Sequence, residues 1–161
     1  MKKTLVLIRH AHRKTAGGTE REQDNGLSEK GHEQAQEVFK KFQKKVEKNR
    51  GNVAILSSPK KRCVQTIQEI ADISGVNLQI SSLLDEERAG EGHAALIGRI
   101  GEFISWWKKD APALTLICSH GDWLPLCMDL LVSREKSFEK GGWVQLVQDA
   151  SGITVAKSSS D

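Results

Sequence analysis

The chain has 161 residues, of which 38% are hydrophobic and 28% are charged, and its formal net charge is +3. These values are ordinary for a soluble globular protein and exclude a disordered, collagen-like or disulfide-built chain. The mild positive charge suits an enzyme of anionic substrates and is too small to indicate nucleic acid as a partner.

The length predicts a single domain over residues 1–161, with 157–161 as a frayed tail. The first apolar run, 4–8, ends at Arg9 and is too short for a signal peptide or a membrane span. The three cysteines are irregularly spaced and form no C-x-x-C motif, so they indicate no disulfide framework. We therefore expect a reduced, cytoplasmic protein with no membrane partner.

Apolar periodicity divides the chain into alternating strands and helices. Ser28 is the expected N-cap of the first helix, and Ser58 with Pro59 the expected start of the second, which Gly75 ends. This alternation predicts a three-layer α/β/α sandwich with a mostly parallel central sheet. In chain order we expect a strand at 5–8, a helix at 29–48, a strand at 53–56, a helix at 58–74, a strand at 78–80, a helix around 96–107, a strand at 114–118, a helix from 121, and strands at 143–147 and 153–155.

Polar clusters follow four of the predicted strands. They are Arg9-His10, the 57–62 segment, the charged loop 85–93, and 119–121. Parallel α/β sheets bind ligands at the carboxyl ends of their strands, so we expect these clusters to meet at one rim of the sheet.

Three motifs in these clusters resemble the histidine phosphatase superfamily. They are R-H-A at 9–11, S-S-P-K-K-R-C-V-Q-T at 57–66 and S-H-G at 119–121, and L-S-E-K-G at 27–31 resembles a further family segment. The superfamily includes cofactor-dependent phosphoglycerate mutases, fructose-bisphosphatases and SixA-type phosphohistidine phosphatases. The resemblance implies a phosphoglycerate mutase-like fold and a phosphoryl-transfer enzyme that uses no metal or other cofactor.

The resemblance also assigns roles to site residues. His10 would be the nucleophile, attacking phosphorus through one ring nitrogen while the other donates to a backbone carbonyl. Arg9 and Arg62 would bind the phosphoryl oxygens, and His120 would add a further donor. Gly121 would let the backbone approach, with the N-terminus of the next helix directed at the anion.

The leaving group needs a general acid when it is an alkoxide. Glu86 is the first candidate for that acid and Glu87 the second, because the family often supplies a glutamate after its third strand. SixA-type members work without such an acid, since imidazole leaves easily from phosphorus.

The substrate is less defined than the reaction. The mutases and sugar bisphosphatases carry R-H-G followed by an acidic residue, whereas this chain has Ala11, His12 and Arg13, and it is shorter than the mutases. We therefore expect a phosphatase of a small phosphomonoester or of a phosphohistidine protein. A mutase-type phosphotransferase and a catalytically silent phosphate-binding module are the alternatives, and the oligomeric state is left open.

Several other residues allow two interpretations. His12 and Arg13 either shape the mouth of the pocket or face water, and His93 lies near the expected acid. Cys63 is expected in packing rather than in redox chemistry. The five lysines of the first helix are expected to form a solvated face that could also dock an acidic protein: Lys40, Lys41, Lys44, Lys45 and Lys48.

Overall fold

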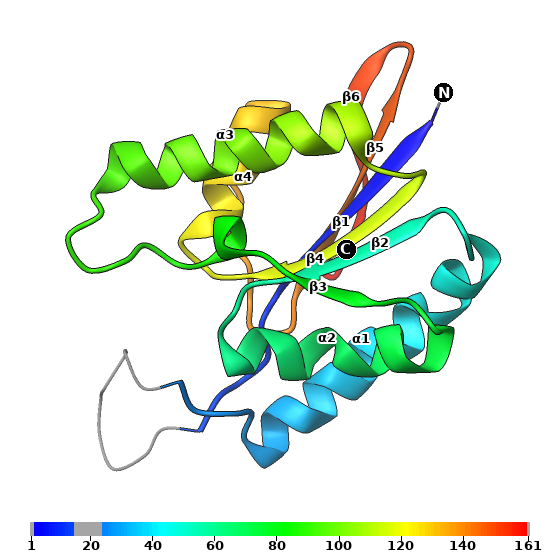
Figure 1. The fold of residues 1–161 in the computed structure, drawn as a ribbon, viewed down its shortest axis with the longest axis vertical. Helices are drawn as coiled ribbons and strands as arrows, with labels where there is room; N and C mark the ends of the chain where they lie inside the picture. The colour runs from blue at the N-terminus through cyan, green and yellow to red at the C-terminus, as the bar shows by residue number, and fades with distance from the viewer. Residues whose placement is uncertain (1, 15–23, 161) are drawn as a thin grey trace.

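Within residues 2–14 and 24–160, which the computed structural model describes, six strands form one sheet in the order β3-β2-β4-β1-β5-β6. Strands β1 to β4 pair in parallel, whereas β5 and β6 pair antiparallel to their neighbours. Helices α1 and α2 cover one face and α3 and α4 the other (Figure 1). The expected three-layer sandwich is confirmed. The elements are β1 Lys3–Arg9, α1 Glu29–Lys48, β2 Val53–Ser57, α2 Lys61–Ser74, β3 Leu78–Ile80, the short 3₁₀ helix η1 Ser82–Leu84, α3 His93–Asp110, β4 Leu114–Ser119, α4 Trp123–Val132, β5 Trp143–Asp149 and β6 Gly152–Ser158.

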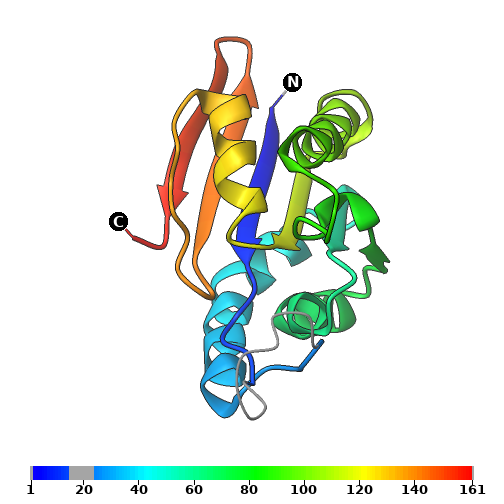
Figure 2. The same cartoon turned by 90° about the vertical axis from the view of Figure 1, so that its left-hand side faces the viewer.

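Strand β1 lies at the centre of this arrangement, between β4 and β5 (Figure 2). Its side chains alternate between two cores: Leu5 and Leu7 pack with α3 and α4, whereas Val6 and Ile8 pack with α1 and α2. Both faces of β1 are therefore buried, which explains why the strand is a continuous apolar run. The parallel register pairs Arg9 with Ser119, so the polar residues after β1 and β4 emerge side by side.

Helix α1 begins and ends where the sequence predicts. The Ser28 hydroxyl accepts a hydrogen bond from the Gly31 backbone N–H at 3.0 Å, which is the expected N-cap. A Cβ placed on Gly31 would lie 1.9 Å from the His12 carbonyl oxygen, so only glycine fits where α1 crosses the segment after β1. The L-S-x-x-G segment is thus explained by a cap and a close backbone approach.

Two helix starts differ from the sequence prediction. Helix α2 begins at Lys61 rather than Ser58, because the Ser58 hydroxyl pairs with His120 on another strand end. Helix α4 begins at Trp123, two residues after Gly121, because the N–H groups of Trp123 and Leu124 bond back to the His120 carbonyl. These two donors are used within the chain and are not available to an anion.

The chain end is more ordered than a frayed tail. Lys157 and Ser158 belong to β6, and the backbone N–H of Ser159 donates to the Trp143 carbonyl at 2.9 Å. Asp161 lies outside the described residues. Among the helices that the structure describes, none is long and apolar enough to cross a bilayer.

Candidate active site

A cavity of about 1190 Å³ opens at the carboxyl ends of the parallel strands. Its walls come from segments that are far apart in the sequence and that the parallel register brings to one rim. The predicted clusters therefore meet as expected. The residues of those clusters that line the cavity include Arg9, His10, Arg62, Glu86, Glu87, His120 and Gly121.

His10 follows the last residue of β1 and is only 6% exposed. Its Nδ1 lies 2.8 Å from the Ala11 carbonyl oxygen, which can only accept, so Nδ1 carries the proton and Nε2 keeps a free lone pair. Burial is the main cause that lowers the pKa of His10 to about 3, and Arg62 and Arg9 lower it further. The imidazole is therefore neutral near pH 7.

Thr66 explains the end of the S-S-P-x-x-R-x-x-x-T motif. Its hydroxyl accepts from the Ala11 N–H at 2.9 Å and donates to the Arg62 carbonyl at 2.7 Å. One buried hydroxyl thus joins the backbone beside His10 to the helix turn that carries Arg62.

Arg9 and Arg62 both line the cavity. Arg9 donates to the Phe138 carbonyl at 2.6 Å, and Arg62, which is 3% exposed, donates to Glu86 Oε1 at 2.8 Å. Within the described residues, the buried Nε atoms of both side chains have no hydrogen-bond partner. A Cβ on Gly121 would lie 2.8 Å from Arg9 Cζ, so the glycine makes room for this guanidinium. Two cationic forks with spare donors suit a tetrahedral oxyanion.

His120 faces His10 across the cavity, with ring centroids 5.4 Å apart. Its Nε2 lies 2.8 Å from the Ser58 hydroxyl, and its Nδ1 lies 3.4 Å from an Arg62 nitrogen. Burial, followed by Arg62, lowers the pKa of His120 to about 2. Ser58, which the sequence placed in a rim cluster and as a helix cap, thus contacts a predicted site residue.

The candidate acids differ in their contacts. Besides its ion pair with Arg62, Glu86 has an oxygen 3.9 Å from His120 Nδ1. Glu87 lines the cavity, and its backbone N–H donates to Asp122 at 2.9 Å. Glu86 is therefore the glutamate in contact with the predicted phosphoryl-binding side chains.

Of the residues whose role the sequence left open, some line the cavity and others do not. Arg13 lines the cavity, whereas His12 pairs with Ser28 at 2.6 Å and helps to hold α1. His93 is exposed at the start of α3 and is not part of the cavity wall. Cys63 is fully buried beneath the site, in contact with the Ser119 carbonyl at 3.7 Å, as expected of a packing residue.

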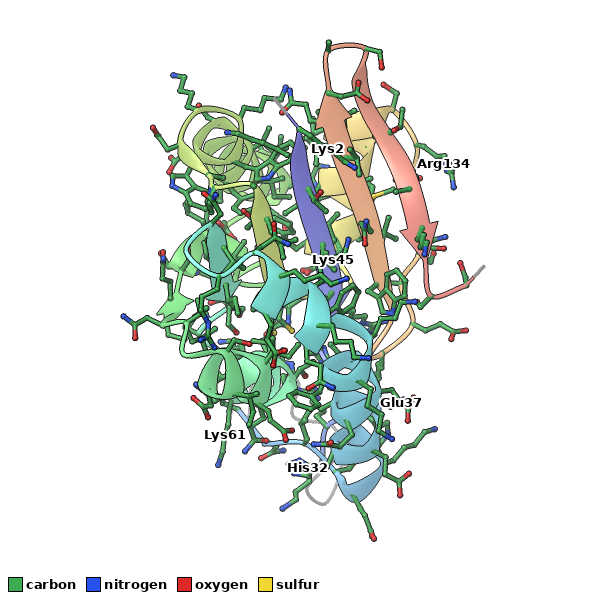
Figure 3. All side chains as sticks on the ribbon, turned by 90° about the vertical axis from the view of Figure 1, so that its right-hand side faces the viewer. Lys2, His32, Glu37, Lys45, Lys61 and Arg134 are labelled. Carbon is green, nitrogen blue, oxygen red and sulfur yellow. The ribbon has the colours of Figure 1, made fainter. Side chains whose placement is uncertain are left out.

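The lysines of α1 lie away from the cavity. Lys45 and His32 are labelled on this helix in Figure 3, which views the molecule from that side. His32 is exposed, and Lys45 is half-buried. The pKa of Lys45 is lowered by burial and then by the neighbouring charges of Lys2 and Lys157. The expected solvated face is present: Lys40, Lys41, Lys44 and Lys48 are exposed.

The segment before β5 also reaches the site, which the sequence prediction missed. Phe138 and Lys140 line the cavity, and the Gly141 N–H lies 3.2 Å from the Arg9 carbonyl and 3.1 Å from that of His10. Strand β5 runs antiparallel to β1, so its first residue lies at the rim where β1 ends. Only the strand direction could have revealed this segment.

In the part of the chain that the structure describes, no three His, Cys, Asp or Glu side chains are grouped as a metal site.

Several solved structures have a similar fold at low sequence identity. They include phosphoserine phosphatase from Entamoeba histolytica, a mutant in complex with phosphoserine (TM-score 0.75, 18% identity, 98% of this chain and 97% of that chain). They also include a protein assigned as the phosphohistidine phosphatase SixA from Agrobacterium tumefaciens (TM-score 0.73, 19% identity, 97% of this chain and 96% of that chain). A third is a protein assigned as an alpha-ribazole-5'-P phosphatase from Escherichia coli (TM-score 0.76, 18% identity, 96% of this chain and 94% of that chain). At these identities the likeness shows the fold.

No curated protein sequence matches the chain. The family comparison is decisive, because residues 5–110 match the histidine phosphatase superfamily (branch 1) and cover more than half of the sequence. Members of this superfamily are phosphatases and phosphotransferases. The chain belongs to the histidine phosphatase superfamily.

Proposed function

We propose that this protein is a metal-independent phosphatase that works through a phosphohistidine on Nε2 of His10. The observation that carries the proposal is the 2.8 Å contact between His10 Nδ1 and the Ala11 carbonyl. It leaves a neutral imidazole with its lone pair on Nε2, in a cavity that also holds two arginines. That is the form of histidine that attacks phosphorus.

In the first step, His10 Nε2 forms a bond to phosphorus while the bond from phosphorus to the ester oxygen breaks. Phosphoryl transfer passes through a loose transition state whose charge is spread over three oxygens. Arg9 and Arg62 supply donors to those oxygens, and His120 supplies another from the opposite wall. No group has to move far, so the rate gain comes from alignment and fixed positive charge.

Glu86 is the proposed proton donor to the leaving oxygen. In the free protein its carboxylate is held by Arg62 at 2.8 Å. A phosphoryl group competes for the same guanidinium, which releases Glu86; the carboxylate then takes up a proton, from the bound ester monoanion or from water, and passes it to the leaving oxygen. In the second step water attacks phosphorus, the bond to Nε2 breaks, and Glu86 takes the water proton. Loss of that proton to solvent, as inorganic phosphate leaves, returns Glu86 to its ion pair with Arg62.

The proposed substrate is a small phosphomonoester or a phosphohistidine protein. The proteins of similar fold are described as acting on both kinds of substrate. A phosphohistidine needs no acid because imidazole is a good leaving group. Glu86→Gln should therefore slow the hydrolysis of a phosphomonoester much more than that of a phosphohistidine protein, which distinguishes the two substrates.

The test is phosphate release from p-nitrophenyl phosphate in excess EDTA, comparing wild type with His10→Ala and His32→Ala. His32 is exposed on α1 and serves as a matched control. The proposal requires turnover by wild type and the control, and loss of at least ~10³-fold in His10→Ala. Full activity of His10→Ala would overturn it. If wild type is inactive on esters and on phosphohistidine but binds phosphate, the silent phosphate-binding alternative holds.

A further inference from the structure

The charges that line the cavity are unevenly distributed. Among the described residues on its wall, six are basic (Arg9, Arg13, Lys60, Arg62, Arg88 and Lys140) and four are acidic (Asp85, Glu86, Glu87 and Asp122). Several ion pairs among these residues lie at the end of the cavity that the 85–88 loop forms. There Asp85 lies 3.9 Å from Lys60 and 3.6 Å from Arg88, and Glu86 lies 2.8 Å from Arg62.

The other end of the cavity, near Arg13 and Lys140, is basic. Within residues 2–14 and 24–160, no carboxylate forms an ion pair with Lys140. The pKa of Lys140 is lowered by burial and then by Arg9 and Arg13, and Lys140 in turn lowers the pKa of His10. Lys140 is an exposed residue whose ammonium group is within electrostatic reach of the nucleophile, and Arg9 and Arg13 are its like-charged neighbours.

Lys140 is held at this end by its neighbours in the chain. On one side the Phe138 carbonyl accepts from Arg9 at 2.6 Å. On the other side the Gly141 N–H bonds to the Arg9 and His10 carbonyls. Gly141 has a φ of 76°, and a Cβ there would lie 3.1 Å from Gln34 Cβ, so the turn is specific to glycine. The backbone of Lys140 is therefore fixed against the strand end that carries His10.

We propose that the substrate carries a second anionic group, a carboxylate or a second phosphate, which Lys140 and Arg13 bind while the reacting phosphoryl group lies between Arg9, Arg62 and His120. This inference rests on the proposed phosphatase function and narrows its substrate to small phosphorylated acids. A second anion at this end supplies the counter-charge that Lys140 lacks among its neighbours in the described chain. A substrate with one phosphate and no other charge would make no ionic contact with this basic end of the cavity.

The experiment compares pairs of phosphomonoesters that differ only in the second charge. For the carboxylate, 3-phosphoglycerate is paired with glycerol 3-phosphate, and phosphoserine with phosphoethanolamine. For the second phosphate, 1,3-propanediol bisphosphate is paired with 3-hydroxypropyl phosphate. Initial rates are measured for wild type, Lys140→Met, Lys140→Arg and Lys61→Met, an exposed lysine on α2 (labelled in Figure 3) that removes the same charge outside the cavity.

We expect wild type to favour at least one doubly anionic partner by about tenfold or more in kcat/KM, which corresponds to about 1.4 kcal/mol. Lys140→Met should lower kcat/KM about tenfold more on that substrate than on its singly charged partner, chiefly through KM, and so remove most of the preference. Lys140→Arg and Lys61→Met should retain the preference.

Two results would overturn the inference while leaving the phosphatase proposal intact. One is equal kcat/KM within every pair for wild type, including the case in which only a phosphohistidine protein is turned over quickly. The other is a loss in Lys140→Met that is the same for both members of a pair. Failure of the phosphatase proposal looks different, because wild type would then release no phosphate from any ester, p-nitrophenyl phosphate included.

Discussion

The Ser58 hydroxyl lies 2.8 Å from Nε2 of His120, and both residues are buried at the ends of neighbouring strands. Ser58 also accepts from the Lys60 N–H at 3.3 Å. The other ring nitrogen of His120, Nδ1, lies on the side of Arg62 and Glu86, 3.4 Å from an Arg62 nitrogen and 3.9 Å from a Glu86 oxygen. A serine on one strand thus holds the ring of a histidine on another, so that Nδ1 faces the predicted phosphoryl-binding side chains.

Replacing Ser58 should therefore weaken catalysis without removing any phosphate ligand. We expect Ser58→Ala to lower kcat about fivefold, since one buried hydrogen bond contributes about 1 kcal/mol. Ser74→Ala is the matched control, because Ser74 is a buried serine whose hydroxyl has no partner in the described part of the chain. The ¹⁵N shifts of His120 report the loss of this hydrogen bond directly. Unchanged shifts and kcat in Ser58→Ala would contradict a role of Ser58 in holding His120.

Gly121→Ala should displace Arg9. The added Cβ would lie 2.8 Å from Cζ of that guanidinium, closer than carbon atoms approach. We expect phosphate to bind about tenfold more weakly in competition with p-nitrophenyl phosphate, because a charge-assisted hydrogen bond contributes roughly 1.5–3 kcal/mol. Gly98→Ala in α3 has open space around the new methyl group and is the control. Equal phosphate affinity in both variants would show that Arg9 does not contact the anion.

Gly31→Ala should destabilise the fold rather than the chemistry. Its Cβ would lie 1.9 Å from the His12 carbonyl oxygen, so α1 and the segment after β1 must separate. We expect a loss of about 3 kcal/mol in the free energy of unfolding, measured by urea denaturation, as for severe overpacking. Gly101→Ala, in open space on α3, should instead gain up to about 1 kcal/mol from helix propensity. Similar stabilities for the two variants would contradict the close approach.

The buried imidazole of His10 should make the protein sensitive to acid. Its pKa is lowered to about 3 in the folded state, from 6.5 for an unperturbed histidine. Between these values the unfolded chain binds a proton that the folded chain does not, so stability falls as the pH falls through this window. Between pH 5.5 and 4.5 we expect His10→Gln to lose about 1.4 kcal/mol less than wild type. Parallel curves for the two proteins would refute a neutral buried His10.

Much of the fold could be predicted from the sequence because caps and apolar periodicity mark the helices and strands locally. Much of the site could be predicted because its polar residues directly follow strands. The Ser28 cap and the apolar stripe of α1 define a helix without outside help. Four polar clusters were placed on one rim by a single property of parallel sheets. The error at the start of α2 has another origin: the partner of Ser58, His120, belongs to a distant segment. Lys140 was missed because its location depends on β5 running antiparallel to β1, which side-chain periodicity does not encode.

The most direct test of the mechanism is the chemical identity of the phosphorylated enzyme. The protein would be mixed with a fast-leaving phosphoester, quenched in base, which preserves phosphohistidine, and digested for mass spectrometry and ³¹P NMR. Because Nδ1 is held by the Ala11 carbonyl, we expect one phosphoryl group on His10, attached at Nε2. Phosphate on Nδ1, on His120 or on no residue during steady turnover would contradict the mechanism.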